Sequence, residues 1–225
     1  GSIFKKKTLS FDELMSYTDD KITEPLLLTI PKQKIKAAVA MFQNLQMYTG
    51  SRKPKGDKVS LLQLIIDGVM DSQQMRDELY MQVIKQIRGC PNQDILRTTL
   101  ELLLILCSMM PISQNYENFV IATIIQTARQ NPEYQELLTL SFLRFQSTSA
   151  REEFQPLTAS KALTIPRSPR GYPQVFCSSI QEYMWAQHTT MPNLPVPLPL
   201  VVLSNHIIDL GGLGMEGLFR INGSA

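Results

Sequence analysis

The sequence is poor in the residues that build metal, redox and disulfide sites. It has three cysteines and two histidines in 225 residues. Cys90, Cys107 and Cys177 lie far apart without the C-x-x-C spacing of a zinc or thiol redox site, and such cysteines favour a reducing compartment. His188 and His206 have no set of candidate ligands beside them. We therefore expect a cytoplasmic protein that binds no metal.

Long apolar runs are also missing. The longest, at residues 102–107 and 197–203, are well short of the roughly 20 residues that a membrane-spanning helix needs. No basic segment followed by an apolar one opens the chain, and Gly1 and Ser2 are typical of the remnant of a cleaved expression tag. The sequence thus predicts a soluble protein with no membrane span.

The patterns of common catalytic sites are absent as well. There is no G-x-S-x-G, and Cys177 forms no recognisable catalytic pattern with either histidine. Gly212, Gly214 and Gly217 spell G-x-G-x-x-G, but they follow an expected helix instead of the strand that a dinucleotide-binding unit requires. We expect no cofactor and no enzyme of these classes.

Positive charge is concentrated near the N-terminus, although the formal net charge of the chain is only +2. Residues 1–60 hold 11 Lys or Arg against 6 Asp or Glu. The lysines cluster in three short stretches, 5–7, 32–36 and 52–58. No aromatic residues alternate with them, so nucleic acid is not the expected partner. Two interpretations stay open: a solvated surface, or a patch that binds an acidic partner through Lys53, Lys55 and Lys58.

Helical periodicity dominates residues 35–155. The expected helices, separated by glycine, proline or polar start signals, cover residues 35–50, 71–89, 95–110, 116–130 and 132–145. Asp71 with Gln74 has the spacing of a capping box, and Ser149 with Glu152 predicts the start of a sixth helix. The predicted fold is all-α, a multi-helix bundle.

Two of these helices carry the predicted core. Met75, Leu79, Val83 and Ile87 recur every fourth residue and predict a buried stripe. The nearly continuous leucines of residues 95–110 predict a helix that is buried on several faces at the centre of the bundle.

The helical pattern breaks at residues 164–173, where three prolines and a glycine cannot continue a helix. The predicted organisation is a helical domain at 1–165, a linker at 166–173 and a second segment at 174–225. In the second segment we expect a short helix within 175–187 and another over 199–210 that ends at Gly211.

The block MRDELYMQVIKQ at 75–86, followed by LRTTLELLLILCSMMPIS at 96–113, resembles the core of the myosin tail homology 4 domain. This family is a helical module found in the tails of unconventional myosins. The resemblance implies a bundle that binds microtubules or acidic protein segments. The N-terminal lysines would then contact this acidic partner.

The end of the chain, GMEGLFRINGSA at 214–225, resembles the opening of a RhoGAP domain, in which a helix leads into a G-L/I-F-R-x-x-G-S loop. The resemblance implies that Arg220 is the arginine finger that acts on a Rho-family small GTPase of the Rac, Cdc42 or Rho class. Gly217 and Gly223 would allow the tight loop, and Phe219 would anchor it. The second segment would then be a truncated, helical first part of a RhoGAP domain, inactive alone.

Two hypotheses follow. In the first, the chain is part of a Rho-family GTPase activator, which supplies a catalytic arginine but is not itself a hydrolase, with a helical module that targets it to the cytoskeleton. In the alternative, the helical module is a non-catalytic interaction domain for microtubules or acidic protein segments, and the second segment is a structural appendage.

Overall fold

The structure of the chain is a computed structural model that describes residues 10–151, 154, 156–166, 179–188 and 190–218. The chain divides into two compact units, Gly1–Pro169 and Arg170–Ala225. All regular secondary structure in the described residues is helical, which confirms the predicted fold class. No helix among them is both long enough and apolar enough to cross a membrane.

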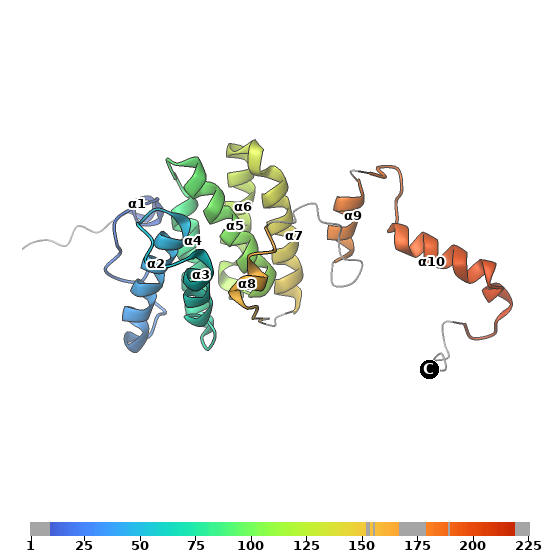
Figure 1. Cartoon of the computed structure of the whole chain (residues 1–225), viewed down its shortest axis with the longest axis horizontal. Coiled ribbons are helices and arrows are strands. Elements are labelled where there is room, and N and C mark those ends of the chain that lie inside the picture. Colours follow the sequence, from blue (N-terminus) through green and yellow to red (C-terminus); the bar gives the residue numbers. More distant parts are fainter. Residues whose placement is uncertain (1–9, 152–153, 155, 167–178, 189, 219–225) are drawn as a thin grey trace, which may run out of the picture. The chain divides into compact units, whose positions relative to one another are not determined.

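The first unit is a bundle of helices joined by short connections (Figure 1). Its elements in chain order are α1 (Phe11–Met15), the 3-10 turn η1 (Lys32–Lys34), α2 (Ile35–Thr49), α3 (Lys58–Asp67), α4 (Gln73–Ile87), α5 (Gln93–Met109), α6 (Gln114–Gln130), the 3-10 turn η2 (Pro132–Tyr134), α7 (Gln135–Arg151) and α8 (Ala159–Ala162).

Helix α5 forms the centre of this bundle. It packs against α7, α4 and α2, so it has neighbours on several sides. Leu100, Leu102 and Leu103 are all fully buried, which confirms the prediction from the leucine-rich sequence. The predicted stripe of α4 is likewise buried, because Met75, Leu79, Val83 and Ile87 all lie in the core.

Helix boundaries follow local chemistry, with two corrections to the sequence analysis. The N-cap of α4 is Ser72, whose hydroxyl accepts a hydrogen bond from the Met75 N–H, and not Asp71. The expected helix start at Ser149 is also wrong, since Ser149 lies inside α7. That serine follows an apolar stripe that continues onto the core, and packing of this stripe extends the helix past a local start signal.

Three helices of the first unit, α1, α3 and the short α8, were missed by the sequence analysis. Helix α1 is short, and its capping box joins Ser10 to Glu13. Helix α3 begins at Lys58, the last residue of the basic stretch 52–58, and Asp57 caps it by accepting a hydrogen bond from Ser60 N at 2.8 Å. An apolar face of Leu61, Leu62, Ile65 and Ile66 buries α3 against α2.

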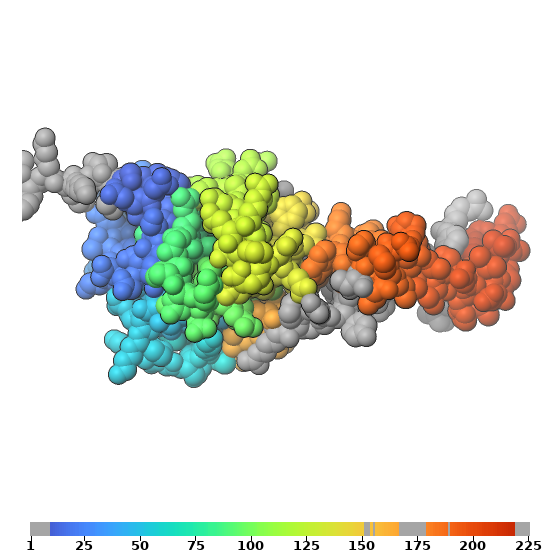
Figure 2. Space-filling view, turned by 90° about the horizontal axis from the view of Figure 1, so that it is seen from above, coloured from blue at the N-terminus to red at the C-terminus, as the bar shows by residue number. Residues whose placement is uncertain are grey.

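The residues between α1 and α2 have little regular structure, yet they are firmly attached. Figure 2 shows the N-terminal segment, in blue, on the surface of the bundle. The Tyr17 N–H donates to the Arg88 carbonyl at 2.8 Å, and α1 packs against α4. The segment is therefore part of the folded domain.

The second unit contains α9 (Ile180–His188), α10 (Leu198–Asp209) and the 3-10 turn η3 (Gly212–Gly214). Gln187 joins its helices, because its side chain donates to the Val196 carbonyl at 2.9 Å and accepts from Leu198 N at 2.7 Å. Helix α10 was predicted, but none of its residues is buried. Gly211 follows it with a φ of +79°, a left-handed conformation that favours glycine.

Candidate functional site

Two of the three candidate lysines, Lys53 and Lys55, lie in the connection between α2 and α3, and Lys58 is the first residue of α3. Gly50, with a φ of +91°, ends α2, and Asp57 caps α3, so both ends of the connection are fixed by local structure. Lys53, Lys55 and Lys58 are all exposed. The backbone therefore presents the three ammonium groups to solvent on a short loop, which we call the basic loop (residues 50–58).

None of the three lysines forms an ion pair within the described part of the chain. The Lys58 ammonium lies 5.7 Å from the centre of the Tyr48 ring, a cation–π distance that holds the side chain near the end of α2. Hydrogen bonds from Ser60 lower the pKa of Asp57, so this capping carboxylate stays ionised beside the lysines. The loop keeps a net positive charge despite it.

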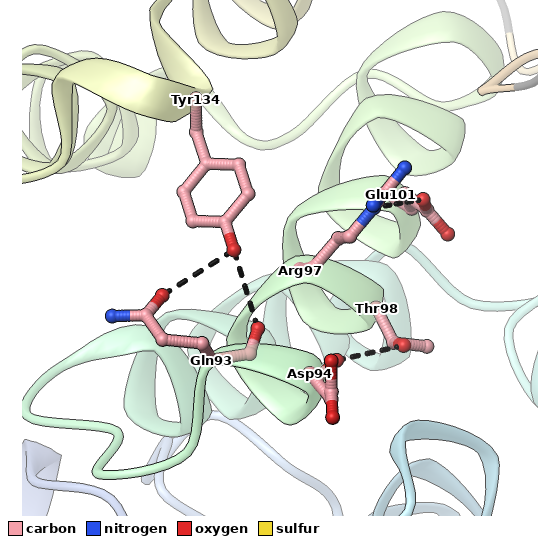
Figure 3. Close-up of polar contacts among 6 residues, drawn as sticks. All are labelled: Gln93, Asp94, Arg97, Thr98, Glu101 and Tyr134. Carbon is pink, nitrogen blue, oxygen red and sulfur yellow. Dashed lines mark hydrogen bonds and ion pairs between the residues drawn. The ribbon is translucent and has the colours of Figure 1, made fainter.

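A groove of about 400 Å³ separates the basic loop from the start of α5. Figure 3 shows the start of α5, which carries charges of both signs in Asp94, Arg97 and Glu101, and of these three only Asp94 lines the groove. Arg97 pairs with Glu101 at 3.3 Å, and Tyr134 donates to the carbonyl of Gln93 at 3.3 Å. Among the residues that line the groove, α5 contributes the carboxylate of Asp94 and no basic side chain, so the positive charge comes from the basic loop.

The basic residues do not form one continuous surface. Lys32, Lys34 and Lys36 lie at the start of α2, whereas the basic loop follows its end. A helix of this length spans about 22 Å, which is more than two Debye lengths at physiological salt. The lysines at 5–7 are outside the described residues. The two described clusters are therefore too far apart to form a single charged patch.

The family-typical block at 75–86 has a structural role in α4. Glu78 is fully buried and accepts hydrogen bonds from the N–H groups of Leu26 and Leu27 at 2.9 and 2.8 Å. The Lys85 ammonium donates to the carbonyls of Leu14 and Ser16 at 2.7 and 2.6 Å. These two charged side chains hold the irregular N-terminal segment on the bundle.

Other polar residues of the block bind loop backbone in the same way. Gln86 donates to the Thr18 carbonyl at 2.9 Å, and Tyr80 donates to the Met110 carbonyl at 2.9 Å. Asp77 accepts from both the N–H and the hydroxyl of Ser113, at 2.9 and 2.6 Å. The block thus satisfies the polar backbone of connections before α2 and between α5 and α6, which a buried backbone requires.

Burial shifts the ionisation of several groups in this framework. It raises the pKa of Glu78, against hydrogen bonds that lower it, and it lowers the pKa of Lys85. It also raises the pKa of the buried Cys107 thiol to about 12, which keeps the sulfur protonated and unreactive. Cys90 and Cys107 are free thiols.

The predicted arginine finger lies outside the described residues, as do Phe219 and Gly223. Gly217 is described and has a φ of +76°, a backbone conformation that other residues rarely adopt. Nearby, Gly212 is buried, and a Cβ there would lie 2.5 Å from the Ile207 side chain. In the described parts of the chain, no three His, Cys, Asp or Glu side chains are placed to share a metal ion.

Comparison with known families finds a match for the central part of the bundle. Residues 62–159 match the MyTH4 domain family. These residues form a MyTH4 domain. The MyTH4 domain is non-catalytic, and its core includes the α4 framework described above. Helices α1 and α2 and the whole basic loop precede the matched residues.

Three curated proteins show the context in which the MyTH4 sequence recurs. A myosin-I heavy chain of Dictyostelium discoideum is 28% identical over 125 residues, covering 53% of this chain and 5% of that protein. Human unconventional myosin-XVB is 38% identical over 85 residues, covering 37% and 3%. The kinesin-like protein KIN-14E of Arabidopsis thaliana is 25% identical over 178 residues, covering 71% and 14%. The chain therefore spans a small part of these motor proteins.

Solved structures show the same MyTH4 fold. The MyTH4-FERM MF1 domain of Dictyostelium discoideum myosin VII has a TM-score of 0.60 with 23% identity, covering 71% of this chain and 34% of that chain. The C-terminal MyTH4-FERM domain of human myosin 7b, solved with the harmonin-a PDZ3 domain, has a TM-score of 0.58 with 20% identity, covering 66% and 32%.

Proposed function

We propose that the MyTH4 domain of this chain is a non-catalytic interaction module that binds an acidic protein surface, with the microtubule as the partner. The observation that carries this proposal is the exposure of Lys53, Lys55 and Lys58 on one short loop, without ion pairs in the described part of the chain. Charges that are not neutralised within the molecule are available to an acidic partner.

The size of the expected effect follows from the exposure of the lysines. An exposed ion pair contributes about 0.2 to 1 kcal/mol, so three pairs give about 0.6 to 3 kcal/mol of salt-sensitive binding energy. Such binding suits reversible attachment to a filament with a repeating acidic surface. The curated relatives are myosins and a kinesin-like protein, which supports a cytoplasmic, cytoskeleton-associated location.

Co-sedimentation of the chain with microtubules at increasing salt tests the proposal. Replacing Lys53, Lys55 and Lys58 together by Gln should weaken binding by about threefold to a hundredfold and flatten its salt dependence. The matched control replaces the same three lysines by Arg, which keeps the charge and should keep the binding. Equal binding and equal salt dependence of the Gln variant would show that the lysines are only solvated surface.

A second candidate function rests on the sequence pattern of residues 216–224. We propose that the second unit opens a RhoGAP domain and that Arg220 acts in trans on a Rho-family GTPase. The order of a MyTH4 domain and a RhoGAP-like segment is similar to that of the Rho GTPase-activating protein Vilse (CrossGAP). The positive φ of Gly217 supports a tight turn before the arginine.

The chemistry of GTP hydrolysis explains the choice of arginine. Negative charge develops on the transferring phosphoryl group, and a guanidinium supplied by an activator stabilises it in the transition state. Arginine is planar, permanently charged and offers several donors to phosphate oxygens. A protein that includes a complete RhoGAP domain should accelerate GTP hydrolysis by Rac, Cdc42 or Rho in single-turnover assays, whereas residues 1–165 alone should not. No acceleration of any of the three would reject this function.

A further inference from the structure

The outer surface between α6 and α7 contains an apolar groove of about 510 Å³. Figure 1 shows these two helices at the side of the bundle away from α1 and α2. Ile124 and Leu138 line the groove and are almost fully buried, while Ile125 beside them is 42% exposed. Ala128 and Phe142 complete the apolar lining. The groove therefore offers apolar surface that the bundle itself leaves in water.

The groove differs in its charges from two other hollows in the described part of the bundle. The hollow beside the basic loop is lined by Lys58 and Asp94 from opposite sides, so its own charges offset each other. A third hollow, near α1, contains Arg88 already paired with Asp12 at 2.9 Å. In the α6–α7 groove the only charge among the lining residues is that of Arg129, which has no side-chain partner in the described part of the chain.

We propose that this groove binds an amphipathic helix of a partner protein, with an apolar stripe in the groove and a carboxylate against Arg129. The proposal goes beyond the binding of microtubules by the basic loop, because it uses none of the loop lysines. It names a second, independent interaction surface on the MyTH4 domain.

The spacing of the lining residues favours a helix as the ligand. The residues from α7 lie at i, i+3, i+4 and i+7: Gln135, Leu138, Thr139 and Phe142. Side chains at this spacing form a ridge along one face of α7, and a third helix that packs between α6 and α7 would contact this ridge. A volume of about 510 Å³ accommodates a few large aliphatic side chains, as in other helix-in-groove complexes.

The charge on the rim selects among such helices. Arg129 lies in the last turn of α6 and is exposed. A carboxylate opposite its guanidinium gains a charge-assisted hydrogen bond, whereas a lysine at the same place is repelled. The apolar stripe provides affinity, and the acidic residue fixes the direction in which the helix lies.

The test uses a stapled synthetic helix of about 16 residues, long enough to cross the groove. It carries leucines at i, i+3, i+4 and i+7 and one glutamate beyond the last leucine, and a matched peptide carries lysine in place of the glutamate. Binding to the 225-residue chain is followed by fluorescence anisotropy, and isoleucine methyl NMR locates the site. The expected result is micromolar or tighter binding of the glutamate peptide, with shifts at Ile124 and Ile125.

Two variants and two controls decide the outcome. Ile125→Ser should weaken binding about tenfold, because one apolar contact is lost. Leu64→Ser, which alters a leucine of α3 that is 54% exposed, should not weaken it. Arg129→Glu should reverse the preference to the lysine peptide. The Gln variant of Lys53, Lys55 and Lys58 should bind as the wild type does, which separates this surface from the basic loop.

Several results would overturn the proposal. These are absence of binding, methyl shifts confined to other helices, equal binding by the Ile125→Ser and Leu64→Ser variants, or no change of peptide preference in Arg129→Glu. Concentration-dependent dimers that Ile125→Ser abolishes would also overturn it, because a second copy of the chain would then be the occupant. Arg129 is exposed, so its variant keeps the test decisive even if Ile125→Ser destabilises the fold.

Discussion

Two helices of this chain reverse the usual relation between composition and burial. Helix α4 is rich in charged and amide side chains, yet Glu78, Gln82 and Lys85 are buried. Helix α10 is almost entirely apolar in its first half, yet Leu200 and Leu203 are 56% and 61% exposed. The difference teaches that burial depends on what the rest of the fold presents. Polar side chains of α4 meet backbone N–H and carbonyl groups of the N-terminal segment that need partners, whereas no residue of α10 is buried.

The two blocks that carried the family resemblances differ in the same way. The α4 block acts on this chain's own backbone, so it is a property of the fold. The block around Arg220 is proposed to act on another protein. Variants in the first should therefore change stability, and a variant in the second should change activity alone.

The largest expected effect concerns Arg220. In a protein with the complete RhoGAP domain, Arg220→Ala should reduce stimulated GTP hydrolysis by about 10³ to 10⁵, on the order of 4 to 7 kcal/mol, because the finger stabilises the transition state more than the ground state. Arg220→Lys should restore little. Single-turnover hydrolysis, binding to the GTP-loaded GTPase and Tm are measured on one preparation. If Arg220→Ala also lowered binding to the GTPase and Tm, Arg220 would have a structural role, and it would then resemble the α4 residues instead of differing from them.

Removal of the Glu78 carboxylate should have the next largest effect. Glu78→Ala leaves the N–H groups of Leu26 and Leu27 without their buried acceptor and should lower the free energy of unfolding by about 2 to 4 kcal/mol. Chemical denaturation measures this change. Glu133→Ala, at an exposed glutamate, is the matched control and should stay within about 0.5 kcal/mol of the wild type. Equal stability of both variants would show that the Glu78 carboxylate does not stabilise the fold.

The ionisation of Glu78 should give a smaller, pH-dependent effect. Burial raises its folded-state pKa above the ordinary value of 4.5, so the folded state holds the proton more tightly than the unfolded state does. Its contribution is therefore greatest below about pH 4.5 and is lost as the pH rises through the folded-state pKa, with a slope of at most about 1.4 kcal/mol per pH unit.

Comparison of the wild type with Glu78→Gln isolates this term, because glutamine does not titrate. The difference in unfolding free energy between the two proteins should move in favour of Gln as the pH rises from about 4 toward 7. A constant difference across that range would mean that the pKa of Glu78 is the same in the folded and unfolded states.

The smallest effect is expected in α10. Leu203→Ser should change the stability of this chain by less than about 0.5 kcal/mol, since the side chain is 61% exposed. Leu79→Ala, at a fully buried leucine of α4, should cost about 2 to 5 kcal/mol. Thermal and chemical denaturation of both variants compare the two helices directly. A large loss in Leu203→Ser would show that α10 is covered in solution.

Several features of the fold could be predicted from sequence because their causes are local or periodic. The stripe of α4 and the leucines of α5 follow helical spacing, and apolar side chains at that spacing need a common core. Gly211 after α10 follows from the left-handed conformation that glycine tolerates. Helix α3 was missed because it begins directly after a basic stretch and its apolar face is short. That face is buried only because α2 packs against it.

The sequence by itself determined the all-α class, the buried stripes of α4 and α5, and the concentration of positive charge near the N-terminus. Only the tertiary structure decided what the polar residues of α4 do, because Glu78 and Lys85 meet Leu26 and Leu14 across more than fifty positions of chain. It likewise decided that α6 and α7 leave an apolar groove beside Arg129. Periodicity reports the side of one helix that is buried, but hydrogen bonds and grooves depend on distances between elements, which are fixed only when the chain packs.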